Sequence, residues 1–419
     1  MKPSKLAIVG LGYVGLPLAH AFAKAGHDVV GYDISAPRIA ELKKGKDWTL
    51  ELTEADLKSV TINYSTDPTM LEDRDVIILA LPTPVDDSND PDMSILESAT
   101  KTVGKHLKKG MIIVYESTVY PGVTEELCGP ILEKESGLKC GTDFTLGYSP
   151  ERVNPGDKLH TIDKILKIVA GQDPKTTDIL CDLYGSIVTA GIHRAPSIKV
   201  AEMAKAIENA QRDLNIAYVN EIAMMCNGIG ISTKDVLAAA GTKWNFLKFQ
   251  PGLVGGHCIG VDPYYLVEKA KQLKLSMPIV TASRAVNDGM SGYVVDQVTK
   301  ALPKNARVLV LGLTFKENIP DIRNSKAIDV VHQFQKTGIA VDVHDPFLSP
   351  EKITALQMTS GSLSGSYDAV VFLVPHKEYL KAGTKGILKA LKPGGVVYDL
   401  KSLLDADAVK KAGALYLAL

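Results

Sequence analysis

The 419-residue sequence lacks the features of several specialised protein classes. Its five cysteines are widely spaced and form no Cys-x-x-Cys pair, which argues against a disulfide framework or a zinc site and predicts a reducing, cytoplasmic setting. A formal net charge of −1 provides no basic excess for nucleic acid or an anionic membrane. No apolar run approaches membrane-spanning length, and glycines interrupt the apolar N-terminal stretch, unlike in a signal peptide. With 45% apolar and 23% charged residues, the composition is that of a soluble globular protein of two or three domains.

Short β-rich runs alternate with helical patterns over residues 5–150, with strands expected at 6–9, 28–32, 76–80 and 111–116. A long helix without proline or glycine is expected over about 197–227, in a core or interface role. The α/β alternation resumes with strands expected at 307–312, 340–344, 369–374 and 396–400 and a helix from about 325. The sequence therefore predicts an α/β fold of two doubly wound, Rossmann-like domains joined by a helical segment. Its expected divisions are 1–196, 197–302 and 303–419.

A glycine-rich turn follows the first expected strand, in the order Gly10-Leu-Gly12-Tyr13-Val14-Gly15. The first glycine permits the turn, the second lets the backbone approach a pyrophosphate, and the third allows close helix–strand packing. The N-terminus of the following helix adds positive potential. Asp33 ends the second strand, where a carboxylate binds ribose hydroxyls and repels a 2′-phosphate, so NAD is predicted in preference to NADP. Arg38 can cap the adenine or pyrophosphate, with a solvated helix arginine as the alternative.

Cys258 lies in the glycine-rich segment Gly255-Gly-His-Cys-Ile-Gly-Val-Asp262. Small neighbours let a substrate carbon reach the sulfur, and a reactive cysteine beside a cofactor site favours oxidation through a thioester. The alternative is a small buried hydrophobic residue. His257 is expected to point away from Cys258 because it is its immediate neighbour in sequence.

Other polar residues have both a catalytic and an ordinary interpretation. Lys205 and Asn209 share one helix face and can bind an oxyanion together, although solvated surface residues are more common. Glu151 is either a general base for hydrolysis or a solvated acid in a proline-rich turn. Lys316 and Arg323 lie after the first strand of the last domain, before a Ser-capped helix, which suits a diphosphate or an ordinary cationic loop.

Seven ordered motifs, covering nearly the whole chain, resemble those of the UDP-glucose/GDP-mannose dehydrogenase family. They are GLGYVGLPLA (10–19), LPTP (81–84), ESTVYPG (116–122), SPERVNPG (149–156), KAIEN (205–209), GGHCIGVDPYYL (255–266) and GLTFKENIPDIRNS (312–325). The resemblance implies a Rossmann domain, a helical dimerisation segment and a C-terminal nucleotide-sugar domain. It also implies a homodimer or a higher homo-oligomer.

The resemblance implies a four-electron oxidation of a sugar C6 hydroxyl to a carboxylate with two NAD and no metal. Cys258 is then the nucleophile that holds a thiohemiacetal and a thioester, while Lys205 and Asn209 stabilise the C6 oxyanion. Asp262 and Thr118 order or activate water, and Glu151 assists thioester hydrolysis. Besides the glycine turn, Asp33 and Arg38, the cofactor is expected to contact Thr83, Thr118 and Arg323. The nucleotide sugar is expected to contact Glu151, Arg152, Val153, Asn154, Lys205, Asn209, Phe249, Gly252, Gly255 and Lys316.

The segment 149–158 resembles most the branch of the family that acts on UDP-N-acetylhexosamines. UDP-N-acetylglucosamine is the favoured substrate, for surface polysaccharide or glycan precursor synthesis, with UDP-N-acetylmannosamine, UDP-glucose and GDP-mannose as alternatives. A two-electron β-hydroxyacid dehydrogenase shares the Rossmann domain and long helix but needs no thiol. A non-catalytic sensor of NAD or nucleotide sugar is a further alternative. The joint presence of Cys258, Lys205, Asn209 and Asp262 argues against it.

Overall fold

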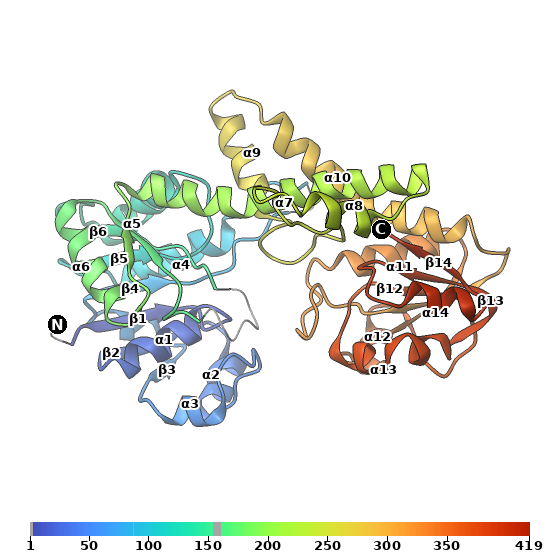
Figure 1. Ribbon diagram of the computed structural model, residues 1–419. Helices are drawn as coiled ribbons and strands as arrows, with labels where there is room; N and C mark the ends of the chain where they lie inside the picture. Colours follow the sequence, from blue (N-terminus) through green and yellow to red (C-terminus); the bar gives the residue numbers. More distant parts are fainter. Residues whose placement is uncertain (1–2, 87, 154–160) are drawn as a thin grey trace. The chain divides into compact units, whose positions relative to one another are not determined.

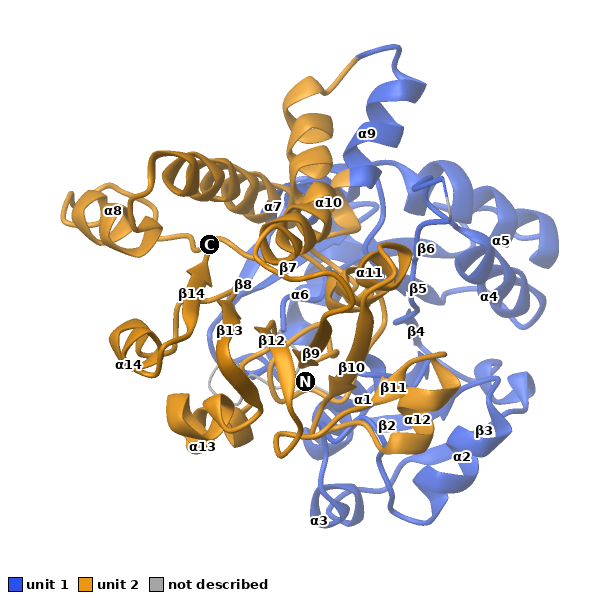
Figure 2. Ribbon diagram, turned by 90° about the vertical axis from the view of Figure 1, so that its right-hand side faces the viewer, with its two compact units in different colours: residues 1–208, 264–275 blue, residues 209–263, 276–419 orange. Residues whose placement is uncertain are grey.

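The computed structural model describes residues 3–86, 88–153 and 161–419 (Figure 1). The chain forms two compact units (Figure 2). Unit 1 contains Met1–Glu208 and Tyr264–Leu275, and unit 2 contains Asn209–Pro263 and Ser276–Leu419. Each unit is built around one sheet, and the helix α7 (Ile198–Ile229) carries the chain from the first unit into the second.

Unit 1 contains an eight-stranded sheet in the order β3-β2-β1-β4-β5-β6-β7-β8, in which only the β6–β7 pair is antiparallel. Its central strands are continuous apolar runs buried on both faces, as a sheet covered by helices on each side requires. The four strands expected from the sequence form to within one residue at each end. The strands are β1 (Lys5–Val9), β2 (Asp28–Tyr32), β3 (Asn63–Ser65), β4 (Val76–Leu79), β5 (Ile112–Tyr115), β6 (Thr145–Tyr148), β7 (Lys167–Gly171) and β8 (Ile192–Arg194).

Three helices of unit 1 begin at residues suited to that position. Ser35, Thr53 and Asp173 cap α2, α3 and α6 by accepting a backbone N–H, and a proline follows in the first turn of α2 and α6. Phe22 of α1 and Tyr184 of α6 pack with their ring centroids 5.6 Å apart in the core of this unit. The helices are α1 (Gly15–Lys24), α2 (Ala36–Lys43), α3 (Glu54–Lys58), α4 (Ser94–Lys105), α5 (Gly129–Ser136), α6 (Pro174–Gly185), the start of α7, and most of α9 (Asp262–Gln272).

Unit 2 contains a six-stranded parallel sheet in the order β11-β10-β9-β12-β13-β14. The strands are β9 (Arg307–Leu311), β10 (Ala340–His344), β11 (Thr359–Ser360), β12 (Tyr367–Phe372), β13 (Leu391–Asp399) and β14 (Leu415–Ala418). The helices are α8 (Thr233–Ala240), α10 (Pro278–Thr299), α11 (Lys326–Lys336), α12 (Pro350–Ala355), α13 (Lys377–Leu388) and α14 (Ala406–Lys411). In both sheets the first six strands run in the doubly wound order 3-2-1-4-5-6, which confirms the predicted fold class.

The helix α7 departs from the usual arrangement of apolar and polar faces. Val200, Met203 and Ile207 are 46%, 42% and 47% exposed, so they do not belong to the core of this chain. The opposite stripe is polar and buried, and consists of Glu202, Lys205, Asn209 and Asp213. In unit 2, Asp213 receives hydrogen bonds from Arg284 and Asn287 of α10. The long helix expected from the sequence therefore forms, but it buries these four polar residues among small apolar ones such as Ala201, Ala206 and Ala210.

Across the described part of the chain, no helix is both long enough and apolar enough to span a membrane. Within the same residues, no group of three or more histidine, cysteine, aspartate or glutamate side chains is arranged to hold a metal ion.

Candidate active site

The glycine turn of unit 1 joins β1 to α1, and its three glycines have different surroundings. Gly10 has a φ of +90°, and a Cβ there would lie 2.7 Å from the Ala80 carbonyl oxygen. A Cβ on Gly15 would lie only 1.8 Å from the Gly10 carbonyl oxygen. A Cβ on Gly12 meets no atom within 4 Å, so this position opens onto free space beside the start of α1. No side chain caps α1 and its first turn has no acidic residue, which leaves its N-terminus suited to a pyrophosphate.

Asp33 follows β2 beside this turn. Its carboxylate accepts backbone N–H groups from Leu11 and Ser35, each at 2.9 Å, which fixes its orientation next to the glycine turn. The open space at Gly12, the uncapped helix and the oriented carboxylate fit a dinucleotide with a free ribose 2′-hydroxyl.

Arg38 is 4% exposed, so the alternative of a solvated arginine is wrong. Its Nε donates to the Leu11 carbonyl at 2.8 Å, and its Nη2 pairs with Asp47 at 2.9 Å. The guanidinium also lies over the Trp48 ring, 5.2 Å from the centroid. Arg38 thus stabilises the glycine turn through its hydrogen bond to Leu11. Its contact with the cofactor stays a prediction.

The loops that follow β4 and β5 are tied together at the carboxyl edge of the sheet. Thr83 Oγ1 donates to the Thr118 carbonyl at 2.7 Å, and Ser117 Oγ accepts the Leu81 N–H at 3.1 Å. Tyr265 donates its hydroxyl hydrogen to the Thr83 carbonyl. Thr83 and Thr118 therefore lie side by side and half-buried, as residues that share one ligand would.

Glu202 of α7 was not expected from the sequence. Its carboxylate accepts the N–H groups of Gly122 and Thr124 at 2.6 and 2.9 Å, which joins the Thr118 loop to the helix that carries Lys205. Burial raises the pKa of Glu202 to about 7, despite these two hydrogen bonds. The only sequence signal for it was its position three residues before Lys205 on the same helix face.

Glu151 follows β6, and its side chain is 13% exposed. Burial raises the pKa of its carboxyl, but Lys167 and the N–H groups of Val153 and Arg152 outweigh burial, so the pKa lies below the usual value. Arg152 donates to the Leu166 carbonyl at 2.9 Å and pairs with Glu208 at 2.8 Å. Asn154 lies outside the described residues.

Lys205 and Asn209 occupy successive turns of the buried face of α7, with exposures of 7% and 5%. The more common interpretation of such a pair, two solvated surface residues, is therefore wrong here. Asn209 Nδ2 donates to Asp262 Oδ2 at 2.5 Å within unit 2, and Asp262 is 1% exposed. An amide expected to bind an oxyanion and a carboxylate expected to order water are thus in direct contact.

Cys258 is solvent-exposed, whereas Cys128 and Cys226 are buried and Cys140 and Cys181 are partly buried. The Cys258 carbonyl accepts the N–H groups of Val261 and Asp262 at 3.1 and 2.8 Å, which places this cysteine in the turn that leads into α9. The alternative of a buried hydrophobic cysteine is therefore wrong.

The glycines before Cys258 let the chain pack against the 315–324 loop of unit 2. A Cβ on Gly255 would lie 2.4 Å from the Asn324 carbonyl oxygen, and one on Gly256, whose φ is +83°, would lie 2.7 Å from the Phe315 ring. His257 Nε2 lies 3.7 Å from Asp321 Oδ2. Burial and then Arg323 lower the pKa of His257, although Asp321 opposes them, so this histidine is neutral at pH 7.

The two cationic residues of the 312–325 motif differ in exposure. Arg323 is 51% exposed on its side chain, and Asp321 accepts from its Nη2 at 2.6 Å. Lys316 is half-buried, and its carbonyl accepts from Thr314 Oγ1 at 3.0 Å.

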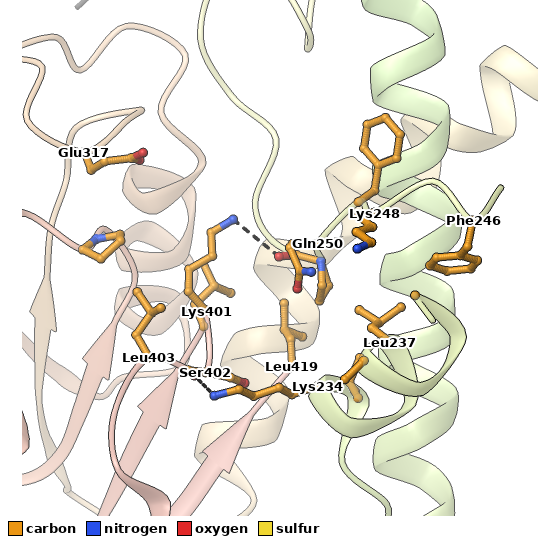
Figure 3. Close-up of a pocket in the computed structure, with 17 residues that line it drawn as sticks. Lys234, Leu237, Phe246, Lys248, Gln250, Glu317, Lys401, Ser402, Leu403 and Leu419 are labelled. Carbon is orange, nitrogen blue, oxygen red and sulfur yellow. Dashed lines mark hydrogen bonds between the residues drawn. The ribbon is translucent and has the colours of Figure 1, made fainter. Parts of the chain in front are cut away.

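Unit 2 also contains a cavity of about 610 Å³ between α8, the 246–251 segment and the loop after β13 (Figure 3). Lys234, Lys248 and Lys401 supply positive charge at its wall, and Phe246 and Phe249 supply aromatic surface. Lys401 Nζ donates to the Pro251 carbonyl at 3.4 Å, and a Cβ on the neighbouring Gly252 would lie 2.6 Å from the same Nζ. Of this set the sequence indicated Phe249 and Gly252 but not the lysines, because they are brought together only by the fold.

Comparison with known proteins identifies the family. Models of the UDP-glucose/GDP-mannose dehydrogenase family match residues 4–188 (NAD binding domain), 199–289 (central domain) and 309–406 (UDP binding domain). The chain is 51% identical to UDP-N-acetyl-D-glucosamine 6-dehydrogenase of Pseudomonas aeruginosa, over 97% of this chain and 99% of that protein. It is 46% identical to the protein of the same name from Salmonella typhi, over 96% and 97%. A solved UDP-D-ManNAc dehydrogenase from Pyrococcus horikoshii, 30% identical, superposes with a TM-score of 0.89 over 99% of this chain and 98% of that one. The chain therefore belongs to the UDP-glucose/GDP-mannose dehydrogenase family and is an NAD-dependent nucleotide-sugar 6-dehydrogenase.

Proposed function

We propose that the protein oxidises the C6 hydroxyl of a UDP-N-acetylhexosamine to a carboxylate, with UDP-N-acetylglucosamine as the preferred substrate. The observation that carries this proposal is the exposed Cys258 in the turn before α9, together with the contact between Asn209 of α7 and Asp262, the first residue of α9. The two relatives that carry the name UDP-N-acetyl-D-glucosamine 6-dehydrogenase support this choice of sugar. The product would serve the synthesis of a surface polysaccharide or another glycan.

The proposed reaction has two oxidations and one hydrolysis. Bound NAD supplies the hydride acceptor for each oxidation, and NADH and a proton leave each time. Between the oxidations, the Cys258 sulfur adds to the C6 aldehyde and forms a thiohemiacetal, which the second oxidation converts to a thioester. Water then attacks the thioester carbonyl, which releases the acid and the thiol. The turn that contains Cys258 leads into α9, which begins four residues later at Asp262, and helix N-termini stabilise an anion such as a thiolate.

The polar residues on α7 and after β6 have distinct proposed roles. Lys205 and Asn209 stabilise the negative charge that develops on the C6 oxygen, and Asp262, through its contact with Asn209, holds that amide in one orientation. Glu151 takes a proton from the attacking water, for which its low pKa keeps it ionised near neutral pH. Thr118 and Asp262 orient that water.

The proposed sites for cofactor and nucleotide follow from the charges in each unit. In unit 1 the NAD pyrophosphate occupies the open space at Gly12, and Asp33 binds the ribose hydroxyls. In unit 2 the cavity between α8 and the loop after β13 combines lysines for a diphosphate with aromatic surface for a uracil. The proposed domain boundaries lie at 196/197, between the NAD-binding domain and the central helical domain, and at 302/303, before the nucleotide-sugar domain.

The exposed apolar stripe of α7 is the proposed homodimer interface. Val200, Met203, Ile207, Tyr218 and Met225 recur at helical spacing, and each is 42–62% exposed. An exposed apolar stripe of this kind is typical of an interface between subunits.

A substrate panel tests the proposed function. Equal concentrations of UDP-N-acetylglucosamine, UDP-N-acetylgalactosamine, UDP-N-acetylmannosamine, UDP-glucose and GDP-mannose are compared with NAD by NADH absorbance. The highest kcat/KM is expected for UDP-N-acetylglucosamine. A preference for UDP-glucose or GDP-mannose would contradict the proposed substrate class, and no turnover with any sugar would favour a non-catalytic sensor.

A further inference from the structure

A buried cluster of charged residues lies at the carboxyl ends of β5 and β6 in unit 1. Glu116 follows β5, and Glu151 lies three residues after β6. Lys167 is the first residue of β7, which runs antiparallel to β6, so its start meets the ends of the other two strands. The β6–β7 register pairs Tyr148 with Ala170. Because the strands are antiparallel, Glu151, three residues after Tyr148, lies opposite Lys167, three residues before Ala170.

Lys167 bridges the two carboxylates. Its Nζ lies 2.9 Å from Glu116 Oε2 and 3.5 Å from Glu151 Oε2, and its side chain is only 4% exposed. Tyr184 of α6 donates to Glu116 Oε1 at 2.5 Å, and its ring centroid is 5.4 Å from Lys167 Nζ. The other oxygen of Glu151, Oε1, accepts the N–H groups of Arg152 and Val153 at 2.7 and 2.6 Å. Both oxygens of Glu151 are therefore held, and within the described residues Oε2 is the oxygen that forms an ion pair.

The pKa directions agree with this geometry. Burial raises the pKa of Glu116, and the attraction of Lys167 offsets only part of that rise. Burial lowers the pKa of Lys167, but Glu116 and then Glu151 outweigh burial and the net shift is upward. Lys167 therefore stays charged between two different carboxyl groups. The environment disfavours the ionised form of Glu116 and favours the ionised form of Glu151.

Other charged groups face Glu151 from neighbouring elements. Lys205 of α7 also favours the ionised form of Glu151, and Arg152 forms an ion pair with Glu208. Lys24 of α1 and the acids Glu51 and Asp163 line the same cavity as Glu151. Of all these groups, Lys167 makes the largest electrostatic contribution to the pKa of Glu151.

We propose that Lys167 is a positioning residue for Glu151: it places a positive charge beside Glu151 Oε2 and fixes that oxygen, while Glu116 and Tyr184 hold Lys167 in place. The inference rests on the proposed function in one respect, which is that Glu151 accepts the proton of the water that attacks the thioester. The geometry also makes Glu116 a competitor, because it shares the charge of Lys167 with Glu151.

Two variants of the full-length protein should shift the pKa of Glu151 in opposite directions. Glu116→Gln retains a hydrogen-bond acceptor for Lys167 and Tyr184 but removes the competing charge, so the pKa of Glu151 should fall. Lys167→Met in the Glu116→Gln background leaves no buried charge unpaired at Glu116, and the pKa of Glu151 should rise relative to Glu116→Gln. An opposite charge at this distance shifts a carboxyl pKa by about one to three units, which is the size of the rise expected. Circular dichroism and NAD affinity serve as the controls for folding of unit 1.

The protonation of Glu151 is read directly by infrared titration of the carboxylic acid C=O band, and adding Glu151→Gln to each variant identifies the band that belongs to this residue. The acid limb of the kcat profile with UDP-N-acetylglucosamine should move by the same amount and in the same direction. If the infrared band of Glu151 titrates at the same pH in both variants, the proposed role of Lys167 is wrong. If the band shifts as expected but no UDP-sugar is oxidised, the proposed function fails while the effect of Lys167 on Glu151 stands.

Discussion

Alanine substitutions at Gly12 and Gly15 should separate cofactor binding from stability. A methyl at Gly15 would lie 1.8 Å from the Gly10 carbonyl oxygen, against a lower limit of 3.0 Å for real contacts, so the turn or α1 must move by at least 1.2 Å. Overpacking of this kind costs about 1–3 kcal/mol. For a unit of this size that corresponds to a melting temperature lower by about 2–12 °C. NAD affinity should fall as well, because the turn itself is displaced.

Gly12→Ala should weaken NAD binding without lowering the melting temperature. Its methyl meets no protein atom within 4 Å, so the melting temperature should not change. The methyl instead enters the space proposed for the pyrophosphate, and NAD should bind about tenfold more weakly or worse, a loss of about 1.4 kcal/mol or more. Gly185→Ala is the matched control, since it also lies in unit 1 with nothing within 4 Å and is distant in sequence from the turn.

Thermal unfolding by circular dichroism and NAD titration by calorimetry measure both quantities on each variant. Wild-type NAD affinity in a folded Gly12→Ala protein would show that the cofactor does not pass over this turn. An unchanged melting temperature in Gly15→Ala would refute the packing argument.

Four further substitutions test individual residues. Asp33→Ala should raise the KM for NAD about tenfold or more, since a charge-assisted hydrogen bond contributes about 1.5–3 kcal/mol. It should also reduce the preference of the enzyme for NAD over NADP. An unchanged ratio of kcat/KM for NAD and NADP would exclude this role of Asp33. Lys205→Ala should lower kcat by about 100- to 1000-fold, as for an oxyanion donor, while calorimetry shows little change in the Kd of the UDP-sugar; a raised Kd with normal kcat would make Lys205 a binding residue instead. Cys258→Ala should abolish the formation of the uronic acid, as measured by chromatography, and should leave the affinity for NAD unchanged. Near-normal turnover would mean that Cys258 is structural. Ile207→Lys should convert the proposed dimer to a monomer in light scattering, because it places a charge in the apolar stripe of α7. A stable dimer in this variant would show that the interface lies elsewhere.

Local sequence patterns were sufficient to predict the central strands and the glycine turn. Runs such as 76–79 and 112–115 are apolar throughout, and a strand buried on both faces of a sheet needs that pattern. The turn at Gly10 and the close packing at Gly15 follow from one short motif, and both are visible in the surroundings of these residues, while the approach of a pyrophosphate to Gly12 stays a prediction.

The buried polar residues were harder to predict because their environment depends on distant parts of the chain. Lys205 and Asn209 are charged or polar residues on a helix, which are usually solvated, yet both are buried. Nothing local indicates that Glu116, Glu151 and Lys167 form one cluster, because strand order and the antiparallel β6–β7 register bring them together. The same applies to the lysines of the unit 2 cavity, which come from α8, the 246–251 segment and the loop after β13.

The stoichiometry of the reaction tests the central claim most directly. With a limiting amount of UDP-N-acetylglucosamine and excess NAD, the absorbance of NADH at completion is compared with the uronic acid and free aldehyde measured by chromatography. The account predicts two NADH for each acid formed and almost no free aldehyde, because Cys258 retains the aldehyde between the two oxidations. One NADH per sugar with release of the aldehyde would contradict it and would indicate a simple two-electron dehydrogenase.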